Sequence, residues 1–344
     1  MKALVLTRAN HFEYADTPEP AVGDGDVLVR VKAVGICGSD VHGMTGKTGR
    51  RIPPIVMGHE ASGIIEAVGP GVSSFSVGER VTFDSTIYCN TCEYCRSGRV
   101  NLCSRRRVLG VSCAEYRRHG AMAQFVAVPQ YVLYRLPDSV GFEVAALIEP
   151  VSVAFHAVRR AAMSLGESVV VFGCGLIGLL IIQAARLSGC GTLSAVDINP
   201  KRLEEARNAG ADVVIDSSKS DPVAAVRQGG EGVEVGFEAV GITPTVGAAV
   251  ECVRKGGRLV LVGNISPEIA LGLQSVVTRE IDLRGSCASA GEYPAILGMI
   301  ADGRLKLQGL ISAVAPLSEG GSWFQKLSEG DGQLLKVVLL PDAE

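Results

Sequence analysis

The sequence predicts an α/β protein in which a β domain, built as a barrel or a sandwich, is joined to a doubly wound parallel sheet. Two observations predict this class. The texture of the chain changes near residue 150, where short β-like runs between Gly- and Pro-rich turns give way to apolar strands that alternate with helices. In the second part, a glycine-rich turn at residues 173–178 joins a buried strand to a helix, as in a nucleotide-binding βαβ unit.

The first part of the chain is predicted to be β structure because its apolar residues occur in short runs between turns. Turn-forming residues at 23–26 and 77–80 punctuate runs that are rich in valine, isoleucine and alanine. The expected strands are 27–34, 61–68, 80–83 and 123–128.

The second part is predicted to be a parallel sheet covered on both faces. Strands that are apolar throughout are buried on both sides, and a crossover helix lets neighbouring strands run parallel. The expected strands are 168–172, 192–196, 212–215, 233–237 and 258–262, and the clearest helices are 176–187 and 200–209.

The last segment of the chain reverts to the texture of the first part. It contains a helix near 293–301 and a closing strand at 336–340. We expect this tail to rejoin the β domain, which makes that domain discontinuous. The predicted domains are therefore 1–150 with 288–344, and 151–287 inserted between them.

Size and composition exclude several classes of protein. The chain has 344 residues, enough for two domains, and its 47% hydrophobic and 20% charged residues indicate a globular fold. The net charge of −3 argues against a nucleic-acid partner held by bulk electrostatics. The longest apolar run, 176–185, is about half the length of a membrane span. Ten cysteines without a secretion signal indicate a reducing compartment, and we expect a soluble cytoplasmic protein.

Four cysteines lie in one short lobe with the spacing C-x2-C-x2-C-x7-C. They are Cys89, Cys92, Cys95 and Cys103. Four thiolates close a tetrahedral structural zinc site, and we favour this interpretation. Two disulfides and an iron–sulfur cluster are the alternatives, although the spacing is unlike a ferredoxin run. Because a closed zinc site is not itself reactive, we expect the reactive metal elsewhere in the chain.

The glycine-rich turn has the spacing of a dinucleotide-binding motif. Gly173 permits the tight turn, Gly175 lets a pyrophosphate approach the backbone, and Gly178 allows close contact between helix and strand. Leu176 and Ile177 occupy the first helical positions, where N–H groups and the positive end of the helix dipole favour phosphate. The alternative is a glycine-rich turn that binds no ligand.

The residue at the end of the next expected strand indicates which cofactor binds. Asp197 can accept hydrogen bonds from both ribose hydroxyls of the adenosine and would repel a 2′-phosphate. Ile198, and not an arginine, follows it, so the sequence favours NAD over NADP. We expect Arg202 to stack on the adenine.

Three further segments carry possible ligands for a reactive metal. Cys37 lies in the segment 35–42, His59 and Glu60 are adjacent, and Glu149 lies where the two domains are expected to meet. Cysteine, histidine and glutamate form a plausible three-ligand set for a catalytic zinc, with one position open for water or substrate. Taken singly, each also fits an unreactive role: a buried small residue, a hydrogen-bonded loop histidine or a carboxylate at the start of a helix.

The order of these motifs resembles that of the zinc-dependent medium-chain dehydrogenase/reductases. Cys37-Gly-Ser39-Asp-Val-His42, Gly58-His59-Glu60, the cysteine lobe and the glycine turn follow one another as in that family, and the resemblance covers essentially the whole chain. Residues 147–160 resemble the polyol dehydrogenase branch, which includes sorbitol, galactitol-phosphate, butanediol and threonine dehydrogenases. In that branch a glutamate replaces the second cysteine ligand of typical alcohol dehydrogenases.

The resemblance implies a GroES-like β domain, a Rossmann domain and an active site in the cleft between them. It also implies homodimers or homotetramers and two zinc ions per chain, one catalytic and one structural. Cys37 and His59 would bind the catalytic zinc, and Glu60 or Glu149 would be the third ligand, with these two glutamates able to exchange roles. Ser39 would contact the substrate oxygen, and His42 would pass the proton to solvent. Residues near the nicotinamide amide would be Val262, Gly263, Ser286 and Ala288.

The implied function is oxidation of a secondary alcohol, such as a polyol, a sugar alcohol or its phosphate, to the ketone by hydride transfer to NAD⁺. A butanediol-type or threonine-type 3-dehydrogenase is the alternative. Free sorbitol is in doubt, because the segment 285–294 lacks the Arg-Tyr pair of sorbitol enzymes and Gly43 and Met44 replace their aromatic residues. The basic segments 105–107 and 117–119 would fit an acidic or phosphorylated substrate, or form a solvated loop.

Two other classes are less compatible with these residues. Zinc-free reductases of enones or quinones would need neither Cys37 and His59 nor the cysteine lobe. A relative that keeps the fold and has lost its chemistry would not be expected to keep the complete ligand set.

Overall fold

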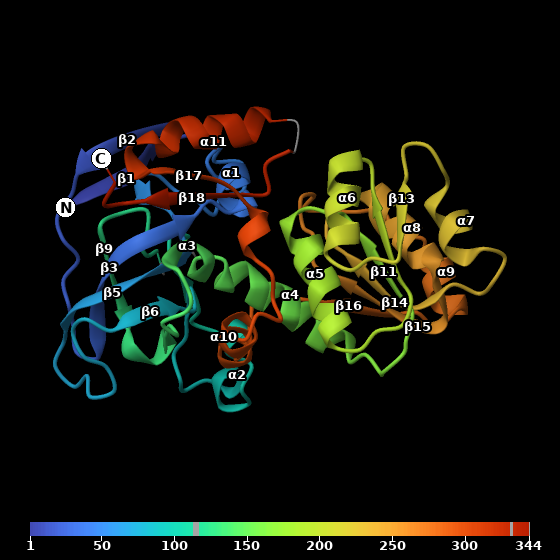
Figure 1. Cartoon of the computed structure of the whole chain (residues 1–344), viewed down its shortest axis with the longest axis horizontal. Helices are drawn as coiled ribbons and strands as arrows, with labels where there is room; N and C mark the ends of the chain where they lie inside the picture. Colours follow the sequence, from blue (N-terminus) through green and yellow to red (C-terminus); the bar gives the residue numbers. More distant parts are fainter. Residues whose placement is uncertain (113–116, 331–332, 344) are drawn as a thin grey trace. The chain divides into compact units, whose positions relative to one another are not determined.

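A computed structural model describes residues 1–112, 117–330 and 333–343. The chain forms two compact units, Met1–Glu149 with Ala290–Glu344, and Pro150–Ser289. The predicted α/β class is confirmed: the first unit is mainly antiparallel β structure, and the second contains a parallel sheet with helices (Figure 1). No helix in the described part of the chain is long and apolar enough to cross a membrane.

The first unit is built around a sheet with the strand order β10-β6-β5-β3-β18-β17, in which β9 also pairs with β3. A smaller sheet has the order β2-β1-β4, and β7 pairs with β8. The bounds are β1 Lys2–Arg8, β2 His11–Asp16, β3 Asp26–Gly35, β4 Ile55–Val56, β5 Glu60–Val68, β6 Arg80–Phe83, β7 Thr86–Ile87, β8 Arg107–Val108, β9 Phe125–Pro129, β10 Leu133–Arg135, β17 Ile311–Pro316 and β18 Lys336–Leu340.

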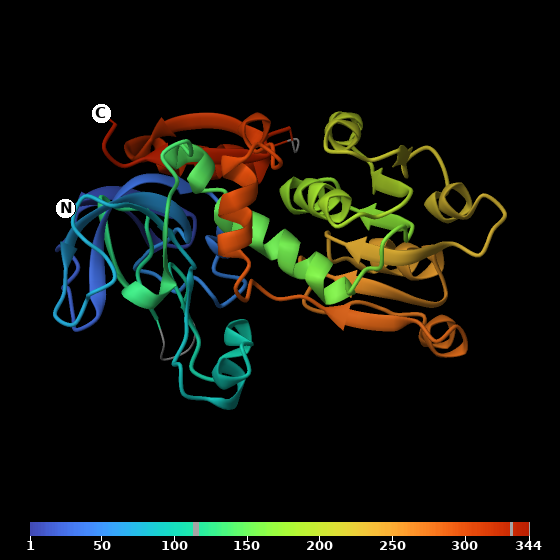
Figure 2. The same cartoon turned by 60° about the horizontal axis from the view of Figure 1, so that its bottom comes forward.

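Strand β3 is central because apolar residues cover both of its faces. Val27, Val29, Val31 and Val34 are fully buried and join one hydrophobic core with residues of β1, β5 and β9. The C-terminal strand β18 pairs antiparallel with the end of β3, so the tail of the chain belongs to this unit. Figure 2 shows the tail beside the β structure of the N-terminal part.

The helices of the first unit are short and lie between or beside the strands. They are α1 Gly38–Gly43, α2 Glu93–Arg96, α3 Phe142–Ala145, α10 Tyr293–Ala301 and α11 Gly320–Glu329, with 3₁₀ turns at Val100–Leu102, Gln130–Val132, Gln308–Leu310 and Leu317–Glu319. Helix α4 Ile148–Ala161 begins in the first unit and continues into the second.

The second unit is a six-stranded parallel sheet with the order β13-β12-β11-β14-β15-β16. This is the doubly wound order whose direction reverses beside its first strand. The bounds are β11 Val169–Phe172, α5 Leu176–Leu187, β12 Leu193–Asp197, α6 Pro200–Asn208, β13 Val213–Asp216, α7 Pro222–Arg227, β14 Val233–Glu238, α8 Thr243–Cys252, β15 Val253–Leu261, α9 Leu273–Thr278 and β16 Asp282–Gly285.

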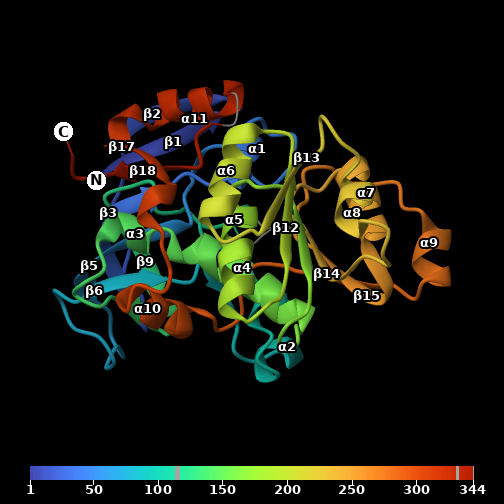
Figure 3. The ribbon, with the colours of Figure 1, turned by 45° about the vertical axis from the view of Figure 1, so that its right-hand side comes forward.

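Helices cover both faces of this sheet, as expected from its fully buried strands. Helices α5 and α6 lie on one side, and α7, α8 and α9 lie on the other (Figure 3). Helix α6 begins at residues that favour a helix start. The side chain of Asn199 accepts hydrogen bonds from the backbone N–H groups of Lys201 and Arg202, and Pro200 occupies the first turn.

Candidate metal and nucleotide sites

Cys37, His59 and Glu60 come together where strands β3 and β5 meet. Glu60 is the first residue of β5 and pairs with Gly35 at the end of β3, and Cys37 follows two residues later. The sulfur of Cys37, a ring nitrogen of His59 and a carboxylate oxygen of Glu60 all lie within 4.8 Å of one another. A thiol, an imidazole and a carboxylate at this separation fit a zinc ion that keeps one open position.

The charges around this group favour a bound cation. Burial, and then the negative charge of Glu60, raises the pKa of the Cys37 thiol to about 12. A thiolate at neutral pH therefore needs a cation beside it. Oxygen Oε1 of Glu60 is buried without a hydrogen-bond partner among the described residues, while Oε2 accepts a 2.5 Å hydrogen bond from Lys336. One carboxylate oxygen thus remains for a metal.

Lys336 is a buried cation that the sequence patterns did not identify. Its side chain is 2% exposed, and its Nζ donates to the carbonyl of Ile36 at 2.9 Å as well as to Glu60. Burial alone would lower the pKa of Lys336, but the negative charges of Glu60 and Cys37 raise it above its usual value. Lys336 therefore stays charged.

His59 faces a second carboxylate. Nitrogen Nδ1 of His59 lies 3.4 Å from Oδ2 of Asp40, and both atoms are buried without a hydrogen-bond partner in the described chain. A carboxylate at one ring nitrogen orients the imidazole, and Nε2 then remains for a metal.

Glu149 lies outside the close group, although its charge interacts with all three members. Burial raises the pKa of Glu149 to about 8, with further effects from His59, Glu60 and Cys37. Its Oε1 accepts a hydrogen bond from Ser85 at 3.3 Å. In this geometry Glu60 is closer than Glu149 to a three-ligand arrangement with Cys37 and His59.

Ser39 and His42 both lie in helix α1. The hydroxyl of Ser39 donates to the sulfur of Cys37 at 3.2 Å, which places it beside the candidate metal ligands. His42 is exposed in the last turn of the same helix.

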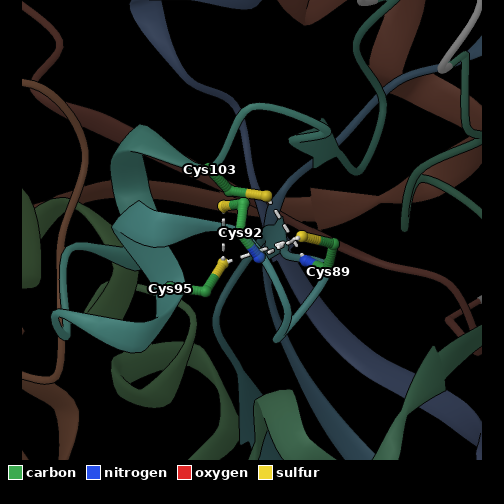
Figure 4. Close-up of side chains that lie close together, drawn as sticks. All are labelled: Cys89, Cys92, Cys95 and Cys103. Atoms are coloured by element: carbon green, nitrogen blue, oxygen red, sulfur yellow. Dashed lines mark hydrogen bonds between the residues drawn. The ribbon is translucent and has the colours of Figure 1, made fainter.

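The four lobe cysteines converge on one point, and none of them forms a disulfide. All four sulfurs lie within 4.8 Å of one another, and the side chains point together in Figure 4. Hydrogen bonds, first from the Thr91 hydroxyl, lower the pKa of Cys89 to about 5, whereas burial raises that of Cys95 to about 12. Four thiolates at this separation require a divalent cation, so the donor set fits zinc.

In the second unit, the glycine turn joins β11 to α5 at the carboxyl end of β11, the strand beside which the strand order reverses. Gly173 has a φ of 88°, and a Cβ on Gly178 would lie 1.8 Å from the carbonyl oxygen of Gly173. A Cβ on Gly175 would meet nothing within 4 Å, so that side of the backbone is open to a ligand. The turn, which includes Leu176 and Ile177 at the start of α5, therefore fits a pyrophosphate group.

Asp197 ends β12, 8% exposed, beside this turn. Its Oδ2 accepts a 2.6 Å hydrogen bond from the N–H of Cys174, and its Oδ1 accepts from the N–H groups of Ile198 and Asn199. These bonds fix the carboxylate at the end of its strand. Arg202 lies in the first turn of α6, the helix that follows.

The residues implied for the nicotinamide lie after strands β15 and β16. The N–H groups of Val262 and Gly263 donate to the carbonyl of Glu238, and Ala288 has a φ of 52°. The hydroxyl of Ser286 is buried without a hydrogen-bond partner among the described residues, as expected for a group that meets a ligand.

Glu238 organises this edge of the sheet and was not identified from the sequence. Its buried carboxylate accepts hydrogen bonds from the N–H groups of Val240 and Gly241 and from the Thr245 hydroxyl, at 2.7–3.1 Å. A glutamate at the end of an apolar strand is the only sequence signal for it.

The two basic segments meet at a cavity of the first unit beside the cysteine lobe. Arg105, Arg107 and Arg118 line this cavity of about 410 Å³ together with Asp26 and Tyr131. Asp26, the first residue of β3, lines the cavity, whereas Cys37 comes just after the last residue of that strand. The cavity and Cys37 are thus at opposite ends of β3.

Comparisons with known proteins cover nearly the whole chain. Residues 23–138 match the alcohol dehydrogenase GroES-like domain, and residues 177–302 match the family described as zinc-binding dehydrogenase. Sorbitol dehydrogenase of Bacillus subtilis (strain 168) is 34% identical, with 99% of this chain and 98% of that protein covered.

Two solved structures illustrate the likeness in three dimensions. Alcohol dehydrogenase TADH from Thermus sp. ATN1 has a TM-score of 0.91 and 33% identity, with 99% of each chain covered. Galactitol-1-phosphate dehydrogenase from Escherichia coli has a TM-score of 0.91 and 28% identity, with 99% of this chain and 100% of that chain covered.

Proposed function

Because the chain belongs to the zinc-dependent medium-chain dehydrogenase family, as its motifs predicted, we propose that it oxidises a secondary alcohol to the ketone with NAD⁺. The substrate class is a polyol, a sugar alcohol or its phosphate. Relatives named for sorbitol and galactitol-1-phosphate support this class.

The observation that carries the proposal is the group formed by Cys37, His59 and Glu60, whose ligand atoms lie within 4.8 Å. These residues would hold the catalytic zinc, and the four lobe cysteines would hold a structural zinc. When bound, the catalytic zinc would supply Lewis-acid chemistry at the substrate oxygen, and NAD⁺ would supply the hydride acceptor.

The remaining steps belong to side chains of this protein. Ser39 accepts the proton of the substrate hydroxyl as it releases its own hydroxyl proton, and His42, exposed on the same helix, hands the released proton to solvent through the cofactor ribose. Asp40 holds the imidazole of His59, and Lys336 holds one oxygen of Glu60. Glu149 is the alternative third ligand, because its carboxyl is buried beside the same residues.

The cofactor is NAD and not NADP, because Asp197 would repel a 2′-phosphate. The glycine turn cradles the pyrophosphate, and Arg202 stacks on the adenine. Val262, Gly263, Ser286 and Ala288 surround the nicotinamide amide.

We also propose a cytoplasmic homodimer or homotetramer. The nine cysteines in the described ranges form no disulfide, which agrees with a reducing compartment. Light scattering on the purified protein measures the oligomeric state directly.

A panel of alcohols with NAD⁺ and NADP⁺, followed by the absorbance of the reduced cofactor, tests the proposed function. We expect activity with a polyol or a polyol phosphate, two zinc ions per chain, and a preference for NAD⁺. Ser39→Ala is expected to lower turnover and to keep both zinc ions, whereas Ser328→Ala, on the exposed face of α11, is the control. Activity on 2,3-butanediol or threonine alone would favour the alternative substrate class, and no oxidation of any alcohol would refute the proposal.

A further inference from the structure

A buried arginine connects the candidate metal ligands to the candidate proton acceptor. Arg51 lies in the segment between α1 and β4, and its side chain is only 4% exposed. Its Nε and Nη2 donate to Oδ1 of Asp40 at 2.9 and 2.6 Å, and Nη2 also donates to the hydroxyl of Ser39 at 3.2 Å. A planar guanidinium fixes both partners at once, which a single ammonium donor does less rigidly.

Both partners of Arg51 touch a candidate zinc ligand. Oδ2 of Asp40, the oxygen that Arg51 does not use, lies 3.4 Å from Nδ1 of His59. The Ser39 hydroxyl accepts from Arg51 and donates to the sulfur of Cys37. By these hydrogen bonds Arg51 fixes which oxygen of Asp40 faces His59 and orients the hydroxyl hydrogen of Ser39.

We propose that Arg51 is a positioning residue of the reaction, which holds Asp40 against His59 and holds Ser39 beside the substrate oxygen. This inference rests on the proposed function. Groups that orient metal ligands typically change metal affinity or activity by about 10- to 100-fold when they are lost.

The position of Arg51 also explains why residue 43 has no side chain. A Cβ on Gly43 would lie 2.4 Å from Cγ of Arg51, and its next contacts, both at 3.5 Å, would be to Cβ and Cδ of the same residue. A collision with the stem of a side chain cannot be relieved by moving only its far end. Gly43→Ala therefore displaces Arg51 without changing its chemistry.

The test compares Arg51→Met, Arg51→Lys and Gly43→Ala with the wild-type enzyme. Arg50→Met, at the neighbouring exposed arginine, and Gly298→Ala, at an open glycine of helix α10, are the matched controls. Removing Arg51 leaves the buried carboxylate of Asp40 without its cation, which destabilises a fold strongly. The double variant Asp40→Asn with Arg51→Met removes that charge and is the substitute if Arg51→Met does not fold.

We expect Arg51→Met and Gly43→Ala to lower kcat about 10- to 100-fold while the KM for NAD⁺ stays within about twofold, because the cofactor residues are untouched. Arg51→Lys should recover part of the loss. A chelator should remove the catalytic zinc from Arg51→Met about tenfold faster than from the wild type, since His59 is less firmly oriented. Both controls should match the wild type.

Wild-type turnover and wild-type zinc retention in folded Arg51→Met and Gly43→Ala would overturn the inference. A loss of kcat that merely follows the unfolded fraction, with no recovery in Arg51→Lys, would overturn it as well. If the wild-type enzyme oxidises no alcohol, the proposed function fails, while the rate of zinc loss still decides whether Arg51 orients His59 through Asp40.

Discussion

The cysteine lobe at residues 89–103 is expected to depend on its metal for its conformation. Of its fifteen residues, only Asn101 and Cys103 are buried, so the lobe has almost no core of its own. Its one helix, α2, has four residues and would not form in isolation. Cys95→Ser removes one thiolate and should release the lobe.

The size of the effect follows from the contacts of the lobe. Ordering the backbone of fifteen residues costs about 15–30 kcal/mol, and the six backbone hydrogen bonds within the lobe contribute about 3–9 kcal/mol. A structural zinc contributes about 10–16 kcal/mol, which lies within the remainder of roughly 6–27 kcal/mol. If Cys95→Ser loses only about 4 kcal/mol of this, the population of the open lobe rises roughly 1000-fold.

Limited trypsin digestion measures this opening, because Arg96 and Arg99 are exposed within the lobe. Cleavage that requires local opening tracks the population of the open form. We expect cleavage after these arginines to accelerate in Cys95→Ser, with one zinc per chain instead of two. Cys95→Ser should lower stability and oligomer integrity more than it lowers turnover per folded chain.

Cys190→Ser, which removes a partly buried thiol of the second unit, is the control and should keep the wild-type cleavage pattern. A Cys95→Ser protein that has lost one zinc and yet resists trypsin as the wild type does would refute the reasoning. In that case, packing and not metal would hold the lobe.

Three further variants test separate parts of the structure. In the zinc-free protein, Lys336→Met leaves the buried carboxylate of Glu60 unpaired and should lower the free energy of unfolding by about 3–5 kcal/mol in urea titrations, and a change below about 1 kcal/mol would contradict this. Asp197→Asn removes the charge that repels a 2′-phosphate, so the ratio of kcat/KM for NADP⁺ to that for NAD⁺ should rise at least about tenfold; an unchanged ratio would show that Asp197 does not select the cofactor. His119 accepts a hydrogen bond from the N–H of Val56, and burial lowers its pKa below 6.5, so acid is taken up first by the unfolded chain. Stability should therefore fall as the pH drops through 6.5 towards the lower folded value, and a His119→Asn protein with the same pH dependence would rule this out.

Most of the fold could be predicted because its signals are local. Helix α5, helix α10 and strand β18 have the predicted bounds, since each is a continuous apolar or periodic segment between clear turns. Strands β2 and β17 were not predicted. Both are largely exposed or half-buried, and polar residues interrupt their apolar residues, at Glu13 in β2 and at Ser312 in β17.

The candidate sites likewise could be predicted only where their residues are close together in the sequence. The cysteine lobe and the glycine turn could be predicted because all their residues lie within a short segment of fixed spacing. Lys336 and Glu60 are 276 residues apart, and nothing in the sequence near either residue indicates the other. Arg51 likewise has no motif, because its role depends on the approach of one loop to helix α1.

The register of β3 with β5 and with β18 determines whether the reactive group can form at all. Glu60 on β5 lies opposite Gly35, and β18 pairs with the same end of β3 and brings in Lys336. A Cβ on Gly35 would lie 2.3 Å from Oε2 of Glu60 and 3.4 Å from Cδ of Lys336, so the glycine leaves room for both side chains. Because a slip of one residue turns every side chain of a strand to the opposite face, it would remove Glu60 from Cys37 and also expose buried core residues of β5 such as Ile65. Strand register therefore determines the chemistry and the stability of this unit together.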